Sequence, residues 1–159
     1  MILMPKRAWA LLVPIACAVI PHCLPAAEPG RARAYLTGTT VREFPSKCDV
    51  RVDMTGDREI LFVTRSLTLH VPYDKVNDLE YGQHVGQRYV EAVLISPLFL
   101  MSKTRKHYVT VGYVDANGRQ QVLVMQVNKG DVRALLAELE GKTGRRLEYT
   151  DDEARKGRG

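Results

Sequence analysis

Short β-type runs, each ended by a turn signal, follow one another through most of this 159-residue chain. Residues 49–54 (DVRVDM) alternate strictly, with three apolar side chains on one face and three charged side chains on the other. This alternation is typical of a strand with one buried face. Further β-rich runs lie at 59–64, 67–71, 108–114 and 120–127. The sequence predicts a mainly β protein, in which the run at 120–127 is apolar enough to be buried on both faces.

Two other segments are weaker strand candidates. Residues 75–81 (KVNDLEY) suit a strand or a short helix, and we favour the strand. Residues 35–44 contain the Thr-rich piece GTTV and form a candidate first strand. Pro72 ends the strand that precedes 75–81, because proline has no N–H to donate to a ladder. The expected total is six or seven consecutive strands.

The apolar period changes after residue 127. Four apolar side chains recur at i, i+3, i+4 and i+7, which is one face of a helix: Val132, Leu135, Leu136 and Leu139. Asn128 suits the N-cap, and Gly144 suits the left-handed residue that ends a helix. Glu138 and Lys142 have the i, i+4 spacing of an ion pair. The sequence predicts one C-terminal amphipathic helix.

The order of these elements limits the architecture. Consecutive strands joined by short turns pair antiparallel, because parallel pairs need a long crossover. Such a sheet must bury its apolar face, and the helix offers one apolar stripe to cover it. We expect a bent antiparallel sheet or partial barrel, with the helix packed across one opening.

This order resembles the pleckstrin-homology-like (PH-like) fold, including its bacterial and GRAM-like relatives. The resemblance covers residues 48–143 and rests on three phrases: LTLHVPYDKVNDLEYG, HYVTVGYVDANGRQQVLVMQV and DVRALLAELEGKTG. The chain is also similar to small exported bacterial proteins that end in a charged tail like that at 148–156. The resemblance implies a domain that binds phosphoinositides, peptides or partner proteins and is seldom an enzyme. An exported bacterial protein would not meet phosphoinositides, so that ligand is not expected here.

The N-terminus has the features of an export signal. Lys6 and Arg7 precede an apolar stretch at 8–20, and residues 21–27 end in small side chains. Cleavage after Ala26 or Ala27 would remove two of 23 basic residues and none of the 18 acidic ones, so the net charge would fall from +5 to +3. The alternative is retention as an N-terminal anchor. This mild charge argues against a nucleic-acid-binding protein.

The expected domain layout follows from these features. Residues 1–27 form the signal peptide, and 28–47 form a flexible N-terminal segment with the candidate first strand. Residues 48–149 form the PH-like domain, with an apolar and basic insertion at 82–107. Residues 150–159 form a disordered charged tail.

Strong catalytic signatures are absent from the sequence. It contains no GxxxxGK[ST], GxGxxG, HExxH, CxxC or GxSxG motif. A metal site built from His70, Asp74 and His84 is an alternative, but solvated side chains are favoured. Cys48 is the one cysteine outside the signal, so it cannot form an internal disulfide or a cysteine-cluster metal site. We expect it to be buried, the alternative being a free thiol, and we expect no catalytic residue, cofactor or metal.

The apolar stretch AVLISPLFLM at 92–101 lies between basic residues. It is too short to span a bilayer, and Pro97 would break a continuous helix. It could contact an anionic membrane surface, form an interface with a partner or a second copy, or fill the core. The predicted contact residues are Arg88, Leu94, Ile95, Leu98, Phe99, Leu100, Lys103, Arg105, Lys106 and His107.

These features favour a non-catalytic, exported binding module of the cell envelope, either periplasmic or secreted. It would contact an anionic membrane surface or an envelope protein through residues 86–107, and it would sit at the membrane periphery in the first case. The alternative is a homo-oligomeric or partner-binding structural protein that uses the same segment as its interface. A small metal-binding protein or enzyme is the third reading.

Overall fold

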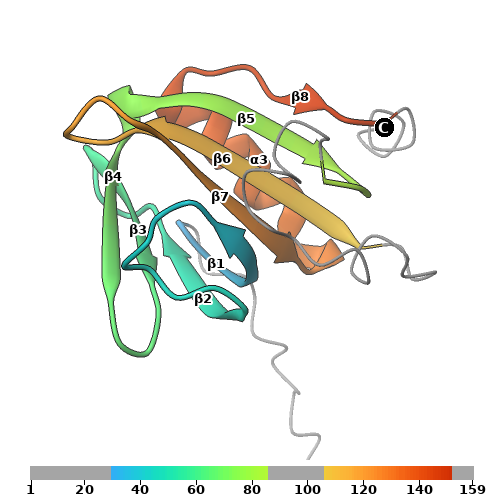
Figure 1. The fold of residues 1–159 in the computed structure, drawn as a ribbon. Coiled ribbons are helices and arrows are strands. Elements are labelled where there is room, and N and C mark those ends of the chain that lie inside the picture. Colours follow the sequence, from blue (N-terminus) through green and yellow to red (C-terminus); the bar gives the residue numbers. More distant parts are fainter. Residues whose placement is uncertain (1–29, 86–105, 152–159) are drawn as a thin grey trace, which may run out of the picture.

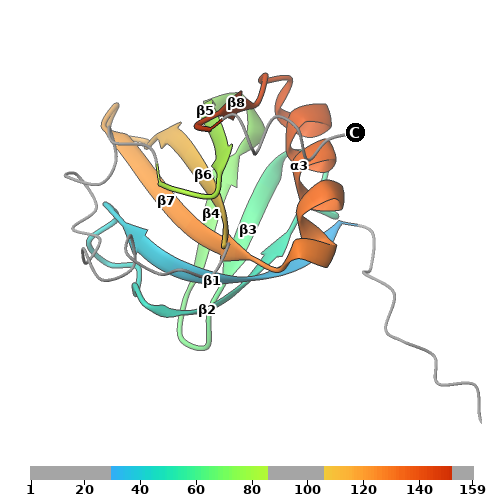
Figure 2. The same ribbon diagram turned by 90° about the vertical axis from the view of Figure 1, so that its right-hand side faces the viewer.

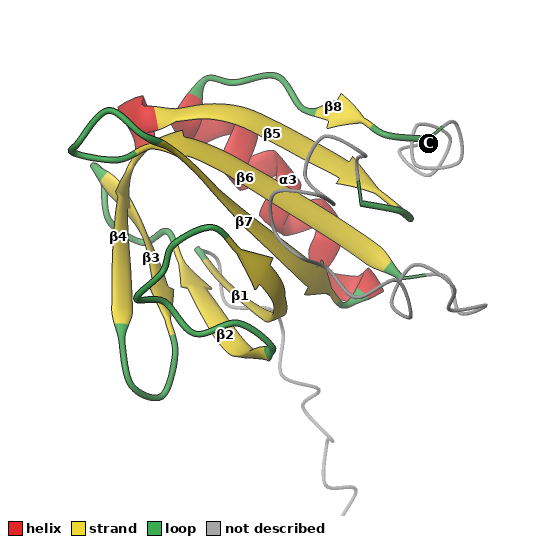
Figure 3. Ribbon diagram, viewed as in Figure 1, coloured by secondary structure: helices red, strands yellow, loops and turns green. Residues whose placement is uncertain are grey.

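A computed structural model describes residues 30–85 and 106–151 of the chain. These residues form an eight-stranded sheet, one 3-10 turn and one α-helix (Figure 3). The strands are β1 (Arg31–Thr39), β2 (Cys48–Asp53), β3 (Glu59–Val63), β4 (Thr68–Pro72), β5 (Val76–Gly82), β6 (His107–Val114), β7 (Gln120–Val127) and β8 (Glu148–Tyr149). The 3-10 turn is η1 (Tyr73–Lys75), and the helix is α3 (Lys129–Thr143).

The sheet is bent and open. Its strand order is β4-β3-β2-β1-β7-β6-β5-β8, so two meanders, β1–β4 and β5–β7, join through the β1–β7 pair. The pairs are antiparallel except that of β5 with the short β8. β3 and β4 run steeply across the direction of β5 and β6 (Figure 1). The prediction of a mainly β fold with one helix is confirmed, and the resemblance to PH-like domains stays a prediction.

The first strand begins earlier than its sequence suggested. β1 starts at Arg31, and residues 31–33 pair with residues 51–53 of β2. The expected flexible start is therefore wrong for these residues, because β1 lies in the middle of the sheet between β2 and β7. The favoured strand at 75–81 is confirmed as β5.

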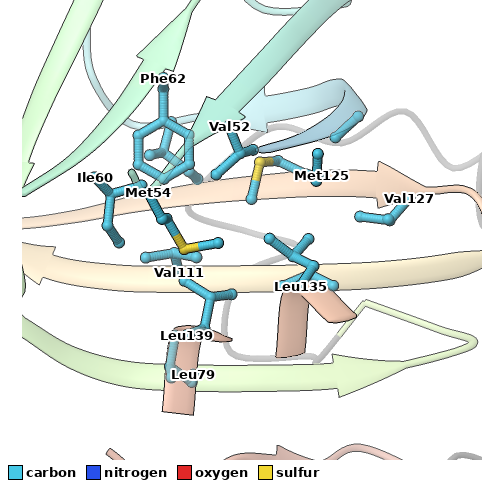
Figure 4. Packing of buried hydrophobic residues seen from close by; sticks show 14 of the residues in the cluster. Val52, Met54, Ile60, Phe62, Leu79, Val111, Met125, Val127, Leu135 and Leu139 are labelled. Atoms are coloured by element: carbon cyan, nitrogen blue, oxygen red, sulfur yellow. The ribbon is translucent and has the colours of Figure 1, made fainter. Parts of the chain in front are cut away.

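The core lies between the concave face of the sheet and α3. Side chains from β2, β3, β5, β6 and β7 point toward one another, and Leu135 and Leu139 of α3 point into the same cluster (Figure 4). Phe62 and Leu139 are fully buried there. All four apolar side chains of the predicted helix stripe are buried, so the period after residue 127 identified the packed face correctly. α3 lies along one opening of the bent sheet (Figure 2).

β6 and β7 are buried on both faces. Leu123 and Met125 of β7 belong to the core cluster, so alternation turns Val122 and Val124 to the opposite face. Those two valines nevertheless expose only 3% and 0% of their surface. Thr110 of β6 is also buried although it does not face the core cluster. The predicted two-sided burial of the 120–127 strand is confirmed.

The ends of α3 correct one capping expectation and confirm another. Gly144 has a φ of 67°, and its N–H donates to the Glu140 carbonyl at 3.0 Å. It is the left-handed terminator that the sequence predicted. The Asn128 side chain makes no capping hydrogen bond; instead its backbone carbonyl accepts from the N–H groups of Asp131 and Val132. The Asn128 side chain therefore remains available to other groups.

The expected Glu138–Lys142 pair is wrong. Glu138 Oε2 accepts a hydrogen bond from the Gly30 N–H at 3.1 Å. Lys142 Nζ donates to the Gly56 carbonyl at 2.9 Å and lies 5.6 Å from the centre of the Tyr73 ring. Both side chains therefore bind backbone groups of Gly30 and Gly56 and attach α3 to these earlier segments. These backbone groups come within reach when the helix packs on the sheet.

The beginning of the C-terminal tail is ordered, which corrects the predicted loose tail for its first two residues. The Thr150 N–H donates to the Tyr81 carbonyl at 3.0 Å, and Asp151 Oδ2 accepts from the Gln83 N–H at 2.7 Å. A Cβ at Gly82 would overlap the Thr150 hydroxyl, so this glycine permits the close approach. Residues 152–159 lie outside the described residues.

Candidate functional site

Most of the predicted contact residues lie outside the described residues: Arg88, Leu94, Ile95, Leu98, Phe99, Leu100, Lys103 and Arg105. The structure describes Lys106 and His107, and both are half-buried. The Tyr81 hydroxyl and His107 Nδ1 are 2.7 Å apart, and the two rings stack with centroids 6.0 Å apart. Burial lowers the pKa of His107, and the charge of Lys129 lowers it further. At neutral pH His107 is therefore uncharged and adds nothing to a cationic surface.

The histidines considered as metal ligands do not come together. His70 is exposed and its Nδ1 lies 3.1 Å from Glu59 Oε1, whereas His84 Nδ1 lies 3.8 Å from Asp151 Oδ2. Within residues 30–85 and 106–151, the one group of three potential metal ligands is Asp78, Glu80 and Glu148. Each of these acids already has an interaction partner in the protein, so we assign no ion to them.

Cys48 is half-buried rather than fully buried, which corrects the favoured expectation. Its Sγ lies 3.6 Å from the Pro45 carbonyl oxygen. Burial raises the pKa of the thiol, and the neighbouring Asp49 carboxylate raises it further. The protonated thiol is a weak nucleophile, because the thiolate is the reactive form.

A groove of about 550 Å³ lies on the outward face of β1, β2 and β7. We call it the arginine groove, because three arginines line it together with polar and apolar residues. Its lining residues are Arg33, Ala34, Tyr35, Asp49, Val50, Arg51, Val63, Thr64, Arg65, Gln126 and Asn128.

Strand alternation turns the charged side chains of β1 and β2 toward this groove. Ala34 of β1 and Val50 of β2 belong to the core cluster, so their neighbours face outward. The register then pairs Arg33 directly with Arg51. Arg65 follows the end of β3 and lines the same groove. Three arginines from separate segments therefore line one hollow.

In the part of the chain that the structure describes, the three arginines have no acidic partner. Among the described residues, no carboxylate oxygen lies within 4.0 Å of the guanidinium groups of Arg33, Arg51 or Arg65. Arg31, two residues before Arg33 on β1, does form an ion pair with an acid. Its Nε lies 3.0 Å from Asp53 Oδ2. Like charges placed directly opposite each other in a sheet are destabilising. The Arg33–Arg51 pair therefore carries a repulsion that a bound anion would relieve.

Uncharged hydrogen-bonding groups complete the lining. Asn128 immediately precedes α3, and its amide is not used for capping. The first turn of a helix carries partial positive charge, which also favours an anion. Gln126 pairs with Tyr35 across the β1–β7 ladder, so both side chains share the outward face. The groove thus combines cationic and neutral donors.

A second hollow, of about 640 Å³, lies beside η1 and suits an anion less well. It is lined by Asp57, Arg58, Glu59, Pro72, Tyr73, Asp74, Lys142 and Thr143. Its three acids outnumber its two bases. One of those bases, Lys142, already binds a backbone carbonyl. We therefore regard the arginine groove as the better candidate site.

Sequence reasoning missed the arginine groove. The alternation at 49–54 already placed Asp49 and Arg51 on the polar face of their strand. No local pattern indicates that Arg33 lies opposite Arg51, because the Gly- and Arg-rich composition around residues 31–33 predicts a flexible start. No protein-family model matches the chain, and no curated protein matches it either. Within the described residues, no helix is long and apolar enough to cross a membrane.

Proposed function

We propose that this chain is a non-catalytic binding module that holds an anionic group in the arginine groove. The directly opposed Arg33 and Arg51, without an acidic partner among the described residues, are the observation that carries the proposal. Arg65 is a third arginine that lines the same hollow. Guanidinium groups bind carboxylate and phosphate oxygens through paired, charge-assisted hydrogen bonds. The ligand is therefore an oxyanion.

The size of the groove supports a small ligand or the end of a larger one. Small-molecule sites commonly enclose about 300–1,000 Å³, and the arginine groove has about 550 Å³. The raised pKa of Cys48 argues against thiol chemistry nearby. Export of the protein stays a prediction that depends on residues 1–27. A role in the cell envelope depends on export and stays a prediction as well.

We predict that inorganic phosphate binds the wild-type protein and that Arg51→Gln weakens this binding about tenfold. A hydrogen bond to a charged group contributes about 1.5–3 kcal/mol, and solvent exposure of Arg51 favours the lower end. Isothermal titration calorimetry at low ionic strength measures both dissociation constants.

Arg133→Gln is the matched control, because Arg133 is an exposed arginine on α3 that does not line the groove. It should bind phosphate as the wild type does. Equal losses in the two variants would mean that phosphate responds to overall charge and would contradict a site at the groove. Failure of the wild type to bind phosphate, pyrophosphate and small carboxylates would contradict the proposal as a whole.

A second proposal is that residues 86–107 contact an anionic membrane surface. The adjacency of the apolar stretch 92–101 to Lys103 and Arg105 in the sequence favours it. Each cation near such a surface contributes about 1 kcal/mol. We therefore expect Lys103→Gln/Arg105→Gln to reduce co-sedimentation with anionic vesicles more than tenfold in partition coefficient.

The vesicle experiment also separates this proposal from its alternative. Equal recovery of the wild-type protein with anionic and neutral vesicles at low salt would exclude the membrane contact. Sedimentation velocity of wild type and Leu98→Asp tests an interface between copies. A wild type that is monomeric at every concentration would exclude the homo-oligomer.

A further inference from the structure

We infer that the ligand of the arginine groove is a phosphate ester that also carries an ammonium group, recognised by Asp49. This inference rests on the proposed function, since it concerns the same groove. Asp49 lines the hollow together with the three arginines. It is exposed, and no cationic side chain of the described residues lies within 4.0 Å of its carboxylate.

The positions of Asp49 and Arg51 separate the charges along the groove. The two residues are two apart on β2, and both face outward. Two steps along a strand cover about 6.6 Å. Asp49 pairs across the ladder with Tyr35, whereas Arg51 pairs with Arg33. One end of the groove is therefore cationic, and the other presents a single carboxylate beside a phenol.

The cationic end suits a phosphate better than a carboxylate. One guanidinium already engages both oxygens of a carboxylate through two parallel hydrogen bonds. Three guanidinium groups offer more donors than two oxygens can accept, and a phosphate monoester offers three terminal oxygens. The three arginines together carry a charge of +3, which a phosphate dianion neutralises further than a singly charged carboxylate does.

Asp49, at the other end of the groove, determines which chemical group on the phosphate ester is favoured. Asp49 repels a purely anionic ligand, because its negative charge faces the same hollow. An ammonium group on a short arm would reach Asp49 while the phosphate stays between the arginines. The Tyr35 hydroxyl, which has no hydrogen-bond partner among the described residues, lies on the strand position opposite Asp49.

Two probes of nearly equal size test the inference. Phosphoethanolamine carries the ammonium group, and ethyl phosphate lacks it. We expect calorimetry at constant ionic strength to give two- to fivefold tighter binding of phosphoethanolamine to the wild type, which is the range of an exposed ion pair. Asp49→Asn should remove this preference and should bind ethyl phosphate at least as tightly as the wild type does. Its thermal unfolding midpoint should not change, because Asp49 is exposed and makes no ion pair among the described residues.

The outcomes separate this inference from the proposed function. If both probes bind and both depend on Arg51, but Asp49→Asn leaves their ratio unchanged, the inference is overturned and the anion groove stands. If neither probe binds, both are overturned.

A further experiment with lipid vesicles distinguishes a lipid headgroup from a free phosphate ester as the ligand. Phosphatidylethanolamine carries the same ammonium group on a phosphodiester, which has two terminal oxygens and one negative charge. Sedimentation with its vesicles that is lost in Asp49→Asn would assign a lipid headgroup and would overturn the preference for a phosphate monoester. Binding to soluble phosphoethanolamine without sedimentation would assign a free phosphate ester. Either result supports the ligand class.

Discussion

Replacing Val124 by aspartate is expected to lower the free energy of unfolding by about 3–5 kcal/mol, the usual loss for an unpaired buried charge. Val124 lies in the middle of β7, exposes none of its surface and faces away from the core cluster that α3 covers. Its ladder neighbours are Gly38 and Thr110, so a carboxylate at this position would lose its hydration without a cationic partner across the ladder. Urea unfolding followed by far-UV circular dichroism measures the change.

Val114→Asp provides the matched control. Val114 is half-buried and is the last residue of β6, so a carboxylate there keeps contact with water. We expect a loss of about 1 kcal/mol or less. If the two variants lose the same small amount, the outward face of β7 is accessible to water, contrary to the burial of Val122 and Val124.

Charge reversal at Arg51 is expected to change stability and binding in opposite directions. Arg51→Glu places a carboxylate directly opposite Arg33, so a repulsive pair becomes an attractive one. Cross-strand pairs of opposite charge contribute roughly 0.2–1 kcal/mol, and the free energy of unfolding should rise by about that amount. Phosphate binding should weaken more than a hundredfold, because one guanidinium is lost and a negative charge is added. Urea unfolding and calorimetry on the same preparation measure both effects.

Arg31→Glu is the mirror-image control. Arg31 pairs with Asp53 in the same ladder, and its Nε lies 3.0 Å from Asp53 Oδ2. The change therefore converts an attractive pair into a repulsive one, and stability should fall. Phosphate binding should be nearly unchanged, because Arg31 does not line the groove. A loss of stability in Arg51→Glu equal to that in Arg31→Glu would mean that Arg51 has a structural role instead.

The opposed arginines of the proposed binding site come at a cost in stability. Like charges across a strand pair lower stability, and the core has to compensate for that loss. Fully buried core side chains such as Phe62 and Leu139 contribute to the stability of the fold. A ligand that bridges Arg33 and Arg51 would stabilise the folded state by mass action.

Much of the secondary structure could be predicted, because it depends on neighbouring residues. The alternation at 49–54 identified β2, and the apolar spacing from Val132 to Leu139 identified the packed face of α3. Gly144 ended the helix as expected, since a residue without a Cβ adopts a positive φ readily. The Asn128 cap and the Glu138–Lys142 pair failed, because tertiary contacts offered other arrangements to the same groups.

The candidate site could not be predicted in the same way. Arg51 was correctly placed on the polar face of its strand, but residues 31–33 look flexible when only their Gly- and Arg-rich neighbourhood is considered. Their strand conformation depends on pairing with residues 51–53 of β2, and the rest of β1 pairs with β7, about ninety residues further along the chain. Backbone hydrogen bonds to another strand stabilise a segment whose own composition does not favour a strand.

The sequence by itself determined which residues alternate, where the apolar period changes and where the helix ends. Those features follow from local backbone geometry, in which side chains repeat every two residues in a strand and every 3.6 in a helix. Only the tertiary structure decided that Arg33 lies opposite Arg51 and that Arg65 and Asp49 share their groove. Register between strands is set by burying one face of the whole sheet, and a slip of one residue would turn every side chain to the other face.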